Sequence, residues 1–284
     1  MTILVFGATG TTGGEVARQL IEARQNIRVL ARDPSRAGAF AGRAEIVQGD
    51  LADPQSLARA LAGVDKLYLV SGTHGGCDPD LEANAIDAAE ATGVRHVVKL
   101  SVIGAEAPRD TFAEWHARSE ARLRSSRLTW TMLRPHFFMS NSLRWADAIR
   151  SQGAFFQPTG EGRWAAIDPA DIGAVAVAAL TQRGHEGQVY DLSGPQSLSG
   201  AEYAVKLAAA IGKPVRFIDA PPAATRDGLL RSGMPSLNAD ALMNLFAAMK
   251  AGKLDFVSDG VRKATGRDAA TFDEWARRNV AAFL

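Results

Sequence analysis

Residues 2–15 read TILVFGATGTTGGE, and this stretch decides the fold. The apolar run Ile3–Phe6 is short and ends at a glycine, which is typical of a parallel β-strand buried on both faces. Glycines follow at Gly7, Gly10 and Gly13. This spacing, placed directly after a strand, predicts a tight turn that leads into a helix and binds the phosphates of a dinucleotide.

Each glycine omits a side chain that would obstruct the turn. Gly7 permits the sharp change of direction, Gly10 lets the backbone approach a phosphate, and Gly13 lets the helix pack against the strand. The helix, expected over residues 14–24, directs free N–H groups and the positive end of its dipole at a pyrophosphate. A structural turn without a ligand is the alternative. The cofactor-binding residues assigned here are Gly7, Thr9, Gly10, Thr11, Thr12 and Gly13.

Composition narrows the remaining possibilities. The 284 residues are 46% hydrophobic and 22% charged, as in a globular chain of one large domain or a domain plus a lobe. A net charge of +1 gives no electrostatic case for nucleic acid or an anionic membrane. The single cysteine, Cys77, excludes an internal disulfide and lacks partners for structural zinc, so no metal is expected. With neither a signal segment nor an apolar run of membrane-spanning length, a cytoplasmic location is expected; the oligomeric state, a homodimer included, stays open.

The end of the second strand selects the nucleotide. Ile27–Ala31 is expected to form this strand, and Arg32 and Arg36 follow it. In such folds an acidic residue here binds the ribose hydroxyls of NAD, whereas an arginine accommodates the 2′-phosphate of NADP. A planar guanidinium can hold a phosphate through two parallel hydrogen bonds, so NADP(H) is favoured. The alternative is a solvated arginine, with Asp33 available to a ribose.

Further strand–helix units extend the sheet. Strands are expected over residues 44–49, 66–70 and 96–100, which predicts an α/β, doubly wound parallel sheet of Rossmann type with helices on both faces. Residues that follow such strands line the ligand crevice. The further cofactor-binding residues assigned on this basis are Asp50, Leu51, Ser71, Gly72 and Thr73.

The fifth strand ends at Ser101, where short-chain dehydrogenases carry a serine that polarises the carbonyl being reduced. Their usual proton donor is a tyrosine with a lysine four residues later. The three tyrosines and the residues four positions later are Tyr68 and Gly72, Tyr190 and Gly194, and Tyr203 and Leu207. The tyrosine–lysine pair is therefore absent.

A family resemblance covers nearly the whole chain. Its matching pieces are residues 7–13, Arg32, residues 93–96, His116 with Ser119 and Glu120, residues 128–135, residues 137–141 and residues 167–172. With these motifs the chain resembles the NmrA-like, atypical short-chain dehydrogenases, among them NADPH-dependent quinone and triphenylmethane-dye reductases. The resemblance implies a Rossmann-type fold and NADP(H). The group also contains redox-sensing regulators that bind a dinucleotide and catalyse little.

Hydride transfer needs positioning and an apolar pocket, and the nucleotide supplies the difficult step. His116 is the first catalytic candidate, as an acid or orienting donor, because histidine titrates near neutral pH. A helix-surface histidine paired with Glu120 is the alternative. Ser101 is the second candidate, and its alternative is a serine that caps a turn.

Aromatic residues follow the sixth strand, expected over residues 128–133. Pro135 and Phe137 are assigned to the cofactor, and Trp115, Phe138 and Trp145 to a flat substrate. Ordinary core packing is the alternative for each aromatic ring.

Two domains are expected. Residues 1–153 form the dinucleotide-binding domain, and residues 154–284 form a smaller, mostly helical substrate or lid lobe, with part of 163–195 returning to the sheet. The sequence predicts an NADPH-dependent reductase of an apolar, conjugated small molecule such as a quinone or dye. An NADP(H)-sensing regulator with a protein partner is the alternative. Isomerase or lyase chemistry ranks third, because no strong acid–base pair is visible.

Overall fold

The computed structural model describes residues 1–71, 78–108 and 111–284. Gly72, Thr73 and Cys77 lie outside the described residues. The chain forms two compact units. The first comprises Met1–Pro135, Pro169–Asp191 and Gly260–Gly266, and the second comprises His136–Asp168, Leu192–Asp259 and Arg267–Leu284. The expected division at residue 153 falls inside the second unit.

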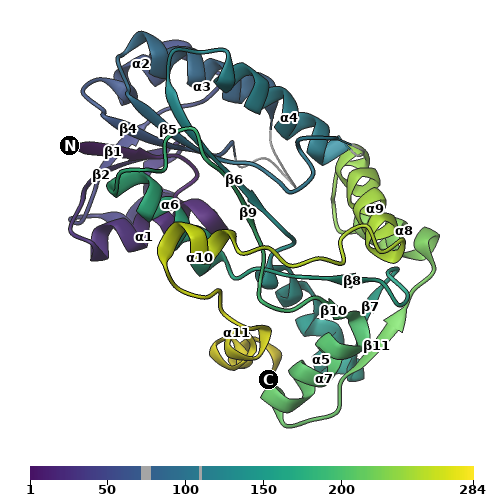
Figure 1. Cartoon of the computed structure of the whole chain (residues 1–284). Helices are drawn as coiled ribbons and strands as arrows, with labels where there is room; N and C mark the ends of the chain where they lie inside the picture. Colours follow the sequence, from purple (N-terminus) through teal and green to yellow (C-terminus); the bar gives the residue numbers. More distant parts are fainter. Residues whose placement is uncertain (72–77, 109–110) are drawn as a thin grey trace. The chain divides into compact units, whose positions relative to one another are not determined.

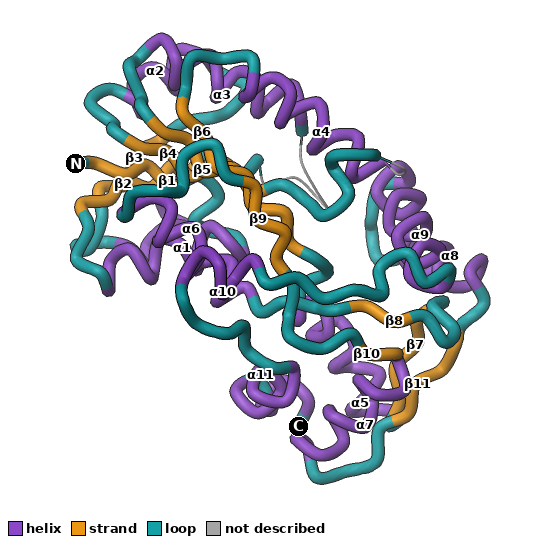
Figure 2. The backbone as a smooth tube through the Cα atoms, in the orientation of Figure 1, coloured by secondary structure: helices purple, strands orange, loops and turns teal. Residues whose placement is uncertain are grey.

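A seven-stranded sheet forms the centre of the first unit within the described residues, in the order β3-β2-β1-β4-β5-β6-β9 (Figures 1 and 2). The strands are β1 (Thr2–Val5), β2 (Asn26–Ala31), β3 (Glu45–Gln48), β4 (Lys66–Leu69), β5 (His96–Leu100), β6 (Thr129–Pro135) and β9 (Val189–Leu192). Every pairing from β3 to β6 is parallel. β9 adds to β6, where the Met132 N–H donates to the Gln188 carbonyl.

Helices cover both faces of this sheet (Figure 1). α1 (Thr11–Glu22) and α6 (Pro169–Thr181) pack together on one face, and α10 (Gly260–Thr265) packs on α6. The other face carries α2 (Pro54–Leu61), α3 (Pro79–Ala91) and α4 (Thr111–Arg124). A 3₁₀ helix, η1 (Pro34–Phe40), follows β2. The predicted doubly wound α/β fold is confirmed.

The strand order fixes where a ligand binds. The chain winds outward from β1 to β3 and then crosses back to β4, so the order reverses between β1 and β4. In open α/β sheets the ligand crevice lies at the carboxyl ends of the strands beside such a reversal. The glycine turn follows β1 and Ser71 follows β4, which places both at this crevice.

Small sheets, helices and an aromatic core make up the second unit. β7 (Ala154–Gln157) pairs in parallel with β11 (Arg216–Asp219), and β8 (Arg163–Trp164) pairs antiparallel with β10 (Leu198–Ser199). The helices are η2 (Met139–Trp145), α5 (Ala146–Gln152), α7 (Gly200–Ile211), α8 (Pro222–Arg231), α9 (Ser236–Lys250), α11 (Phe272–Arg278) and η3 (Val280–Phe283).

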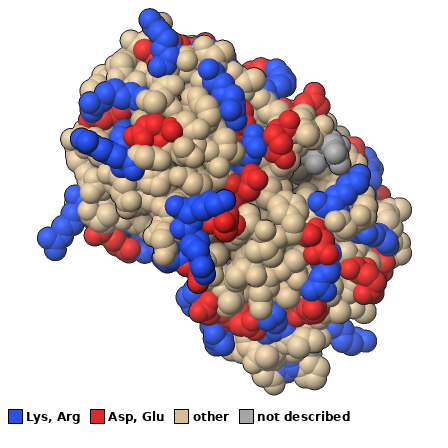
Figure 3. All heavy atoms as spheres, viewed as in Figure 1, with Lys and Arg blue, Asp and Glu red and all other residues tan. Residues whose placement is uncertain are grey.

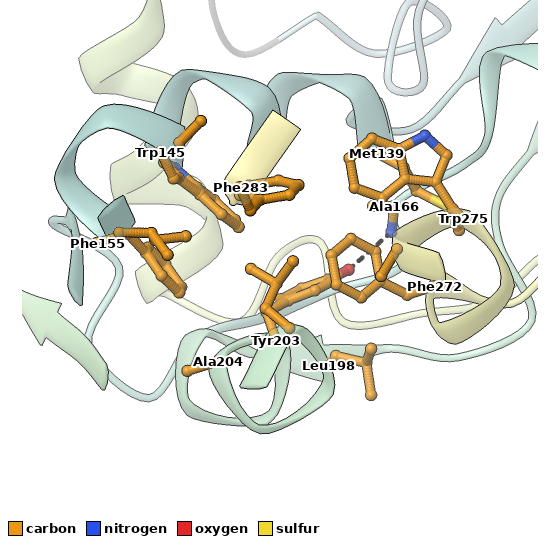
Figure 4. Packing of buried hydrophobic residues seen from close by; sticks show 14 of the residues in the cluster. Met139, Trp145, Phe155, Ala166, Leu198, Tyr203, Ala204, Phe272, Trp275 and Phe283 are labelled. Atoms are coloured by element: carbon orange, nitrogen blue, oxygen red, sulfur yellow. Dashed lines mark hydrogen bonds between the residues drawn. The ribbon is translucent and has the colours of Figure 1, made fainter. Parts of the chain in front are cut away.

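Stacked rings hold this second core together (Figure 4). Trp145 stacks on Phe155 with ring centroids 3.9 Å apart, and Trp164 stacks on Tyr203 at 4.7 Å. The Tyr203 hydroxyl donates to the Trp164 carbonyl and accepts from the Ala166 N–H. The buried phenol thus has the hydrogen-bond partners that a polar group in an apolar core requires.

The last helix is shorter than the sequence pattern predicts. A single helix over residues 271–283 is expected, but α11 ends at Arg278 and Asn279 adopts φ −111°. Its side chain donates to the Trp275 carbonyl, which also accepts from the Asn279 backbone N–H at the helix end. The remaining turn, η3, still directs Phe283 into the core, so the apolar pattern survives the break.

Charged side chains are mixed on the surface. On the face shown in Figure 3, lysine and arginine side chains are interspersed with aspartate and glutamate. Among the described residues, no helix combines the length and apolar character that crossing a membrane requires.

Replacing Gly13 tests how tightly α1 packs against the turn after β1. A Cβ on Gly13 would lie 2.3 Å from the Gly7 carbonyl oxygen, so Gly13→Ala should destabilise the protein by about 1–3 kcal/mol through overpacking. Gly38→Ala in η1 is the control, because a Cβ there meets no atom within 4 Å. Urea denaturation measures both, and equal stability of the two variants would contradict the close packing.

Candidate nucleotide and acceptor site

The glycine turn has the geometry that a pyrophosphate needs. Gly7 adopts φ +65°, and the Gly10 N–H donates to the Gly7 carbonyl at 2.8 Å. Gly10 is also the N-cap of α1, so the first N–H groups of that helix receive no side-chain cap. They are available to an anion, and the helix dipole favours negative charge there. The residues present therefore fit a bound dinucleotide.

The threonines of this turn differ in their exposure to solvent. Thr9 and Thr11 are exposed beside Gly10, whereas Thr12 is only 5% exposed. The open side of the turn is therefore formed by backbone and by Thr9 and Thr11. The cofactor role assigned to these residues stays a prediction.

Two arginines stand exposed after β2. Arg32 and Arg36 form no ion pair within the described part of the chain. Asp33, the alternative ribose ligand, instead caps η1: its Oδ1 accepts from the Ser35 N–H at 3.0 Å and from the Ser35 hydroxyl at 2.7 Å. An exposed guanidinium such as Arg32, which forms no ion pair among the described residues, suits a 2′-phosphate, so this corner fits NADP(H).

The residues that follow β3 lie at the same edge of the sheet as the end of β2. The Gly49 N–H donates to the Ala31 carbonyl, which brings the end of β3 beside the end of β2. Asp50 turns the chain by accepting from the Ala52 N–H at 2.9 Å, and the Leu51 carbonyl accepts from Asn84 at 3.0 Å. Both residues are half-buried at this edge.

The Ser71 hydroxyl is already hydrogen-bonded, because it accepts from the Asp78 N–H at 2.8 Å. This bond joins the end of β4 to the N-cap of α3. The cofactor role assigned to Ser71 stays a prediction.

Ser101 is held by a buried ion pair. Its hydroxyl donates to Glu120 Oε1 at 2.6 Å, and Arg134 grips the same carboxylate through Nε at 2.9 Å and Nη2 at 2.7 Å. Burial raises the pKa of Glu120, but the bonds from Arg134 and Ser101 outweigh it and hold the pKa below its ordinary value. The serine therefore faces a carboxylate, where the dehydrogenase pattern would have it face a carbonyl substrate.

His116 lies on the buried face of α4 and not on the face exposed to solvent. The side chain is 8% exposed, and its Nδ1 lies 3.2 Å from the ammonium of Lys99. Glu120 makes its bonds elsewhere, so the alternative of a surface His116–Glu120 pair is wrong. Burial and the Lys99 charge lower the pKa of His116 well below 6.5. The expectation that this ring titrates near neutral pH does not hold.

Lys99 and Glu82 form the second buried ion pair. Both side chains are fully buried, with Lys99 Nζ 2.8 Å from Glu82 Oε2. The Ser119 hydroxyl donates to the same carboxylate oxygen. Glu82 Oε1 has no hydrogen-bond partner among the described residues. This network joins α3, β5 and α4 next to the carboxyl end of β5.

A hollow of about 370 Å³ lies beside the Ser101 network. Its charged lining residues are Glu106, Glu120, Arg124 and Arg134, and its apolar ones are Ala105, Ala117 and Ala121. Arg124 also stacks over the Trp130 ring at 4.5 Å. The two guanidinium groups face two carboxylates, so the lining carries no excess charge.

The aromatic candidates are distributed over both units. Trp115 is half-buried on α4, with Phe112 edge-on at 5.8 Å. Phe137 and Phe138 are half-buried in the second unit, where Phe138 bridges to Ile167. Trp145 is 8% exposed and stacks in the core, so packing accounts for its position.

His136, a residue that the sequence analysis did not select, joins two segments of the second unit. Its Nδ1 accepts from the Phe137 N–H at 2.9 Å, and its Nε2 lies 3.0 Å from the Leu254 carbonyl. Burial lowers the pKa of His136 to about 4, so the ring is neutral at pH 7. The Phe256 ring lies beside it at 5.6 Å and is 39% exposed.

A double-mutant cycle measures the buried pair in the first unit. Removing one partner leaves an uncompensated buried charge, so Lys99→Met or Glu82→Gln alone should cost about 3–5 kcal/mol. The double variant should lose clearly less than the sum of the two, because neither charge is then stranded. Urea denaturation gives the three values, and strict additivity would show that the two charges do not interact.

The comparisons with known proteins agree with this geometry. The family described as NAD(P)H-binding matches residues 7–183. An NAD(P)H azoreductase of Xenophilus azovorans is 42% identical over 286 residues, which covers 99% of each chain. The predicted NAD(P)H-dependent oxidoreductase is confirmed at the level of these relatives.

Solved structures share the fold. Escherichia coli NADPH-dependent quinone oxidoreductase 2, in complex with NADPH, is 30% identical with a TM-score of 0.88 over 98% of this chain and 99% of that one. Triphenylmethane reductase of Citrobacter sp. is 26% identical with a TM-score of 0.87 over 99% and 100%. The regulator NmrA, at 16% identity and a TM-score of 0.80 over 99% and 95%, shows the fold alone. The chain belongs to the family described as NAD(P)H-binding.

Proposed function

We propose that the protein is an NADPH-dependent reductase that passes hydride to an apolar, conjugated acceptor such as a quinone or a dye. The observation that carries the proposal is the glycine turn at the head of α1, with exposed, unpaired Arg32 after the neighbouring strand. The first feature fits a pyrophosphate and the second a 2′-phosphate. The azoreductase relative and the quinone and dye reductase structures support the acceptor class.

The proposed acceptor class is also consistent with the absence of the usual proton donor of short-chain dehydrogenases. NADPH supplies the hydride when bound, and the protein's part is to position both reactants and exclude water. The tyrosine–lysine pair of short-chain dehydrogenases is absent from the sequence. A quinone or extended dye spreads the negative charge it receives over a conjugated system, so it needs less help from an acid than a simple ketone does.

Relatives favour a reductase over a redox sensor. The regulator NmrA shares the fold at 16% identity, whereas the azoreductase is 42% identical over 99% of the chain. A sensor would need a surface for a protein partner, and no observation in the described residues singles one out.

Turnover is the direct test of the proposal. Purified protein mixed with NADPH and a panel of benzoquinones, naphthoquinones, azo dyes and triphenylmethane dyes should consume NADPH, followed by its absorbance. The Gly13→Ala variant, whose cradle is disrupted, is the negative control. Tight NADPH binding without turnover on any acceptor would overturn the reductase and favour the sensor.

Arg32 should decide between the two nucleotides. Losing a charge-assisted contact to the 2′-phosphate costs about 1.5–3 kcal/mol, so Arg32→Ala should weaken NADPH binding roughly 10- to 100-fold. NADH binding should change little, because NADH lacks that phosphate. Arg59→Ala, which removes the same charge from α2, is the matched control. Calorimetry measures the affinity of the wild type and of both variants for each nucleotide, and equal weakening of NADPH and NADH would remove this role from Arg32.

A further inference from the structure

The ammonium of Lys99 has a full set of partners. A protonated lysine carries three N–H donors. Lys99 Nζ lies 2.8 Å from the Leu100 carbonyl, 2.8 Å from Glu82 Oε2 and 3.2 Å from His116 Nδ1. With the side chain fully buried, these three acceptors account for all three donors.

This arrangement assigns the proton of His116. Because Lys99 can only donate, His116 Nδ1 must accept, and the ring proton of the neutral imidazole then sits on Nε2. Nε2 makes no hydrogen bond within the part of the chain that the structure describes. The ring therefore keeps one donor uncommitted beside the carboxyl end of β5, at the edge of the sheet where the ligand crevice lies.

We propose that Lys99 and Glu82 are positioning residues that lock His116 as a neutral ring protonated on Nε2, which donates a hydrogen bond to the acceptor as it is reduced. The inference rests on the proposed function and adds to it the identity of the donor and the device that sets its tautomer. Glu82 balances the charge of Lys99, and Ser119 holds Glu82 in place.

The charges around His116 keep it in one state. Lys99 faces it from β5, with Glu82 of α3 paired to that ammonium. On its own helix, Glu120 lies one turn away and is paired with Arg134 of β6. The nearest charge is thus a cation that disfavours a second proton, and burial acts in the same direction. A ring held in this way serves as a fixed donor and does not shuttle protons.

The reaction balances without a proton from the protein. A hydride carries two electrons and one proton to a quinone, NADPH becomes NADP⁺, and the quinone becomes the hydroquinone monoanion. Its oxygen carries the new negative charge and accepts the Nε2–H bond. The anion then takes its second proton from water. A donor aimed at developing charge stabilises the transition state more than the ground state.

Nitrogen NMR of the unmodified protein tests the lock without any acceptor. In protein labelled on histidine, the His116 signal, assigned by its loss in His116→Gln, should show Nδ1 unprotonated and Nε2 protonated from pH 5.5 to 8. In Lys99→Met the loss of the ammonium should raise the pKa of His116 from its wild-type position, and Nδ1 should no longer be held unprotonated by a donor. A wild-type His116 that titrates near 6.5, or that carries its proton on Nδ1, would overturn the proposal.

Two substitutions at His116 separate a donor from an acid. Glutamine can accept from Lys99 through its oxygen and donate through its amide, so His116→Gln should keep kcat within about threefold. His116→Leu should lose roughly 100-fold in kcat, as when one transition-state donor is removed. Loss of activity in both variants would show proton transfer, and loss in neither would show a purely structural ring; each result contradicts the donor role.

The pH profile of Lys99→Met completes the test. Wild-type kcat for a quinone should stay flat from pH 5.5 to 8. In Lys99→Met, kcat should fall about twofold at the alkaline end of this range, where the neutral ring divides between two tautomers, and should rise as the pH falls through the raised pKa of the ring, because the cationic ring always carries a proton on Nε2. A loss independent of pH would contradict the positioning role.

If the protein reduces no acceptor, the proposed function fails, while the NMR result still decides whether His116 is held as the Nε2-protonated tautomer. If Lys99→Met does not fold, the wild-type NMR and the two His116 variants decide.

Discussion

The close approach of Gly13 to Gly7 is the constraint on which the site depends. A Cβ at Gly13 would lie 2.3 Å from the Gly7 carbonyl oxygen, so only glycine allows α1 to start directly above the end of β1. That contact sets the direction of α1 and turns its free N–H groups toward the crevice at the sheet reversal. The phosphate cradle and the packing of the first unit therefore arise from the same contact.

Charge buried behind the sheet edge is a second constraint. Lys99–Glu82 and Arg134–Glu120 lie next to the carboxyl ends of β5 and β6, where apolar residues would pack without desolvating ions. Buried pairs of this kind are weak evidence for stability, because desolvation offsets much of the attraction. Here the two ion pairs fix the orientation of the neighbouring side chains. Ser101 and His116, the two residues that sequence patterns select, are each held by one of these pairs.

The sequence predicts the parts of the fold that depend on local pattern. The glycine turn and the five strands that follow from Ile27 to Leu133 require only short-range signals, and strand bounds differ by a residue or two. The break at Asn279 escapes prediction because apolar spacing continues across it. Lys99 and Glu82 do carry a signal: a lysine in an apolar strand, and a glutamate on the face of Ala85, Ile86 and Ala89. Each is uninterpretable alone, because the partner lies 17 residues away.

The environment of His116 shows why residue type alone misassigns chemistry. Histidine suggests an acid near neutral pH, yet burial and one ammonium leave this ring neutral. For an acceptor that delocalises the charge it receives, a steady donor is more useful than a group whose state varies with pH. On the proposed mechanism the absence of a tyrosine–lysine pair and the neutral imidazole are compatible, because a fixed donor stabilises the charge on the acceptor and water supplies the last proton.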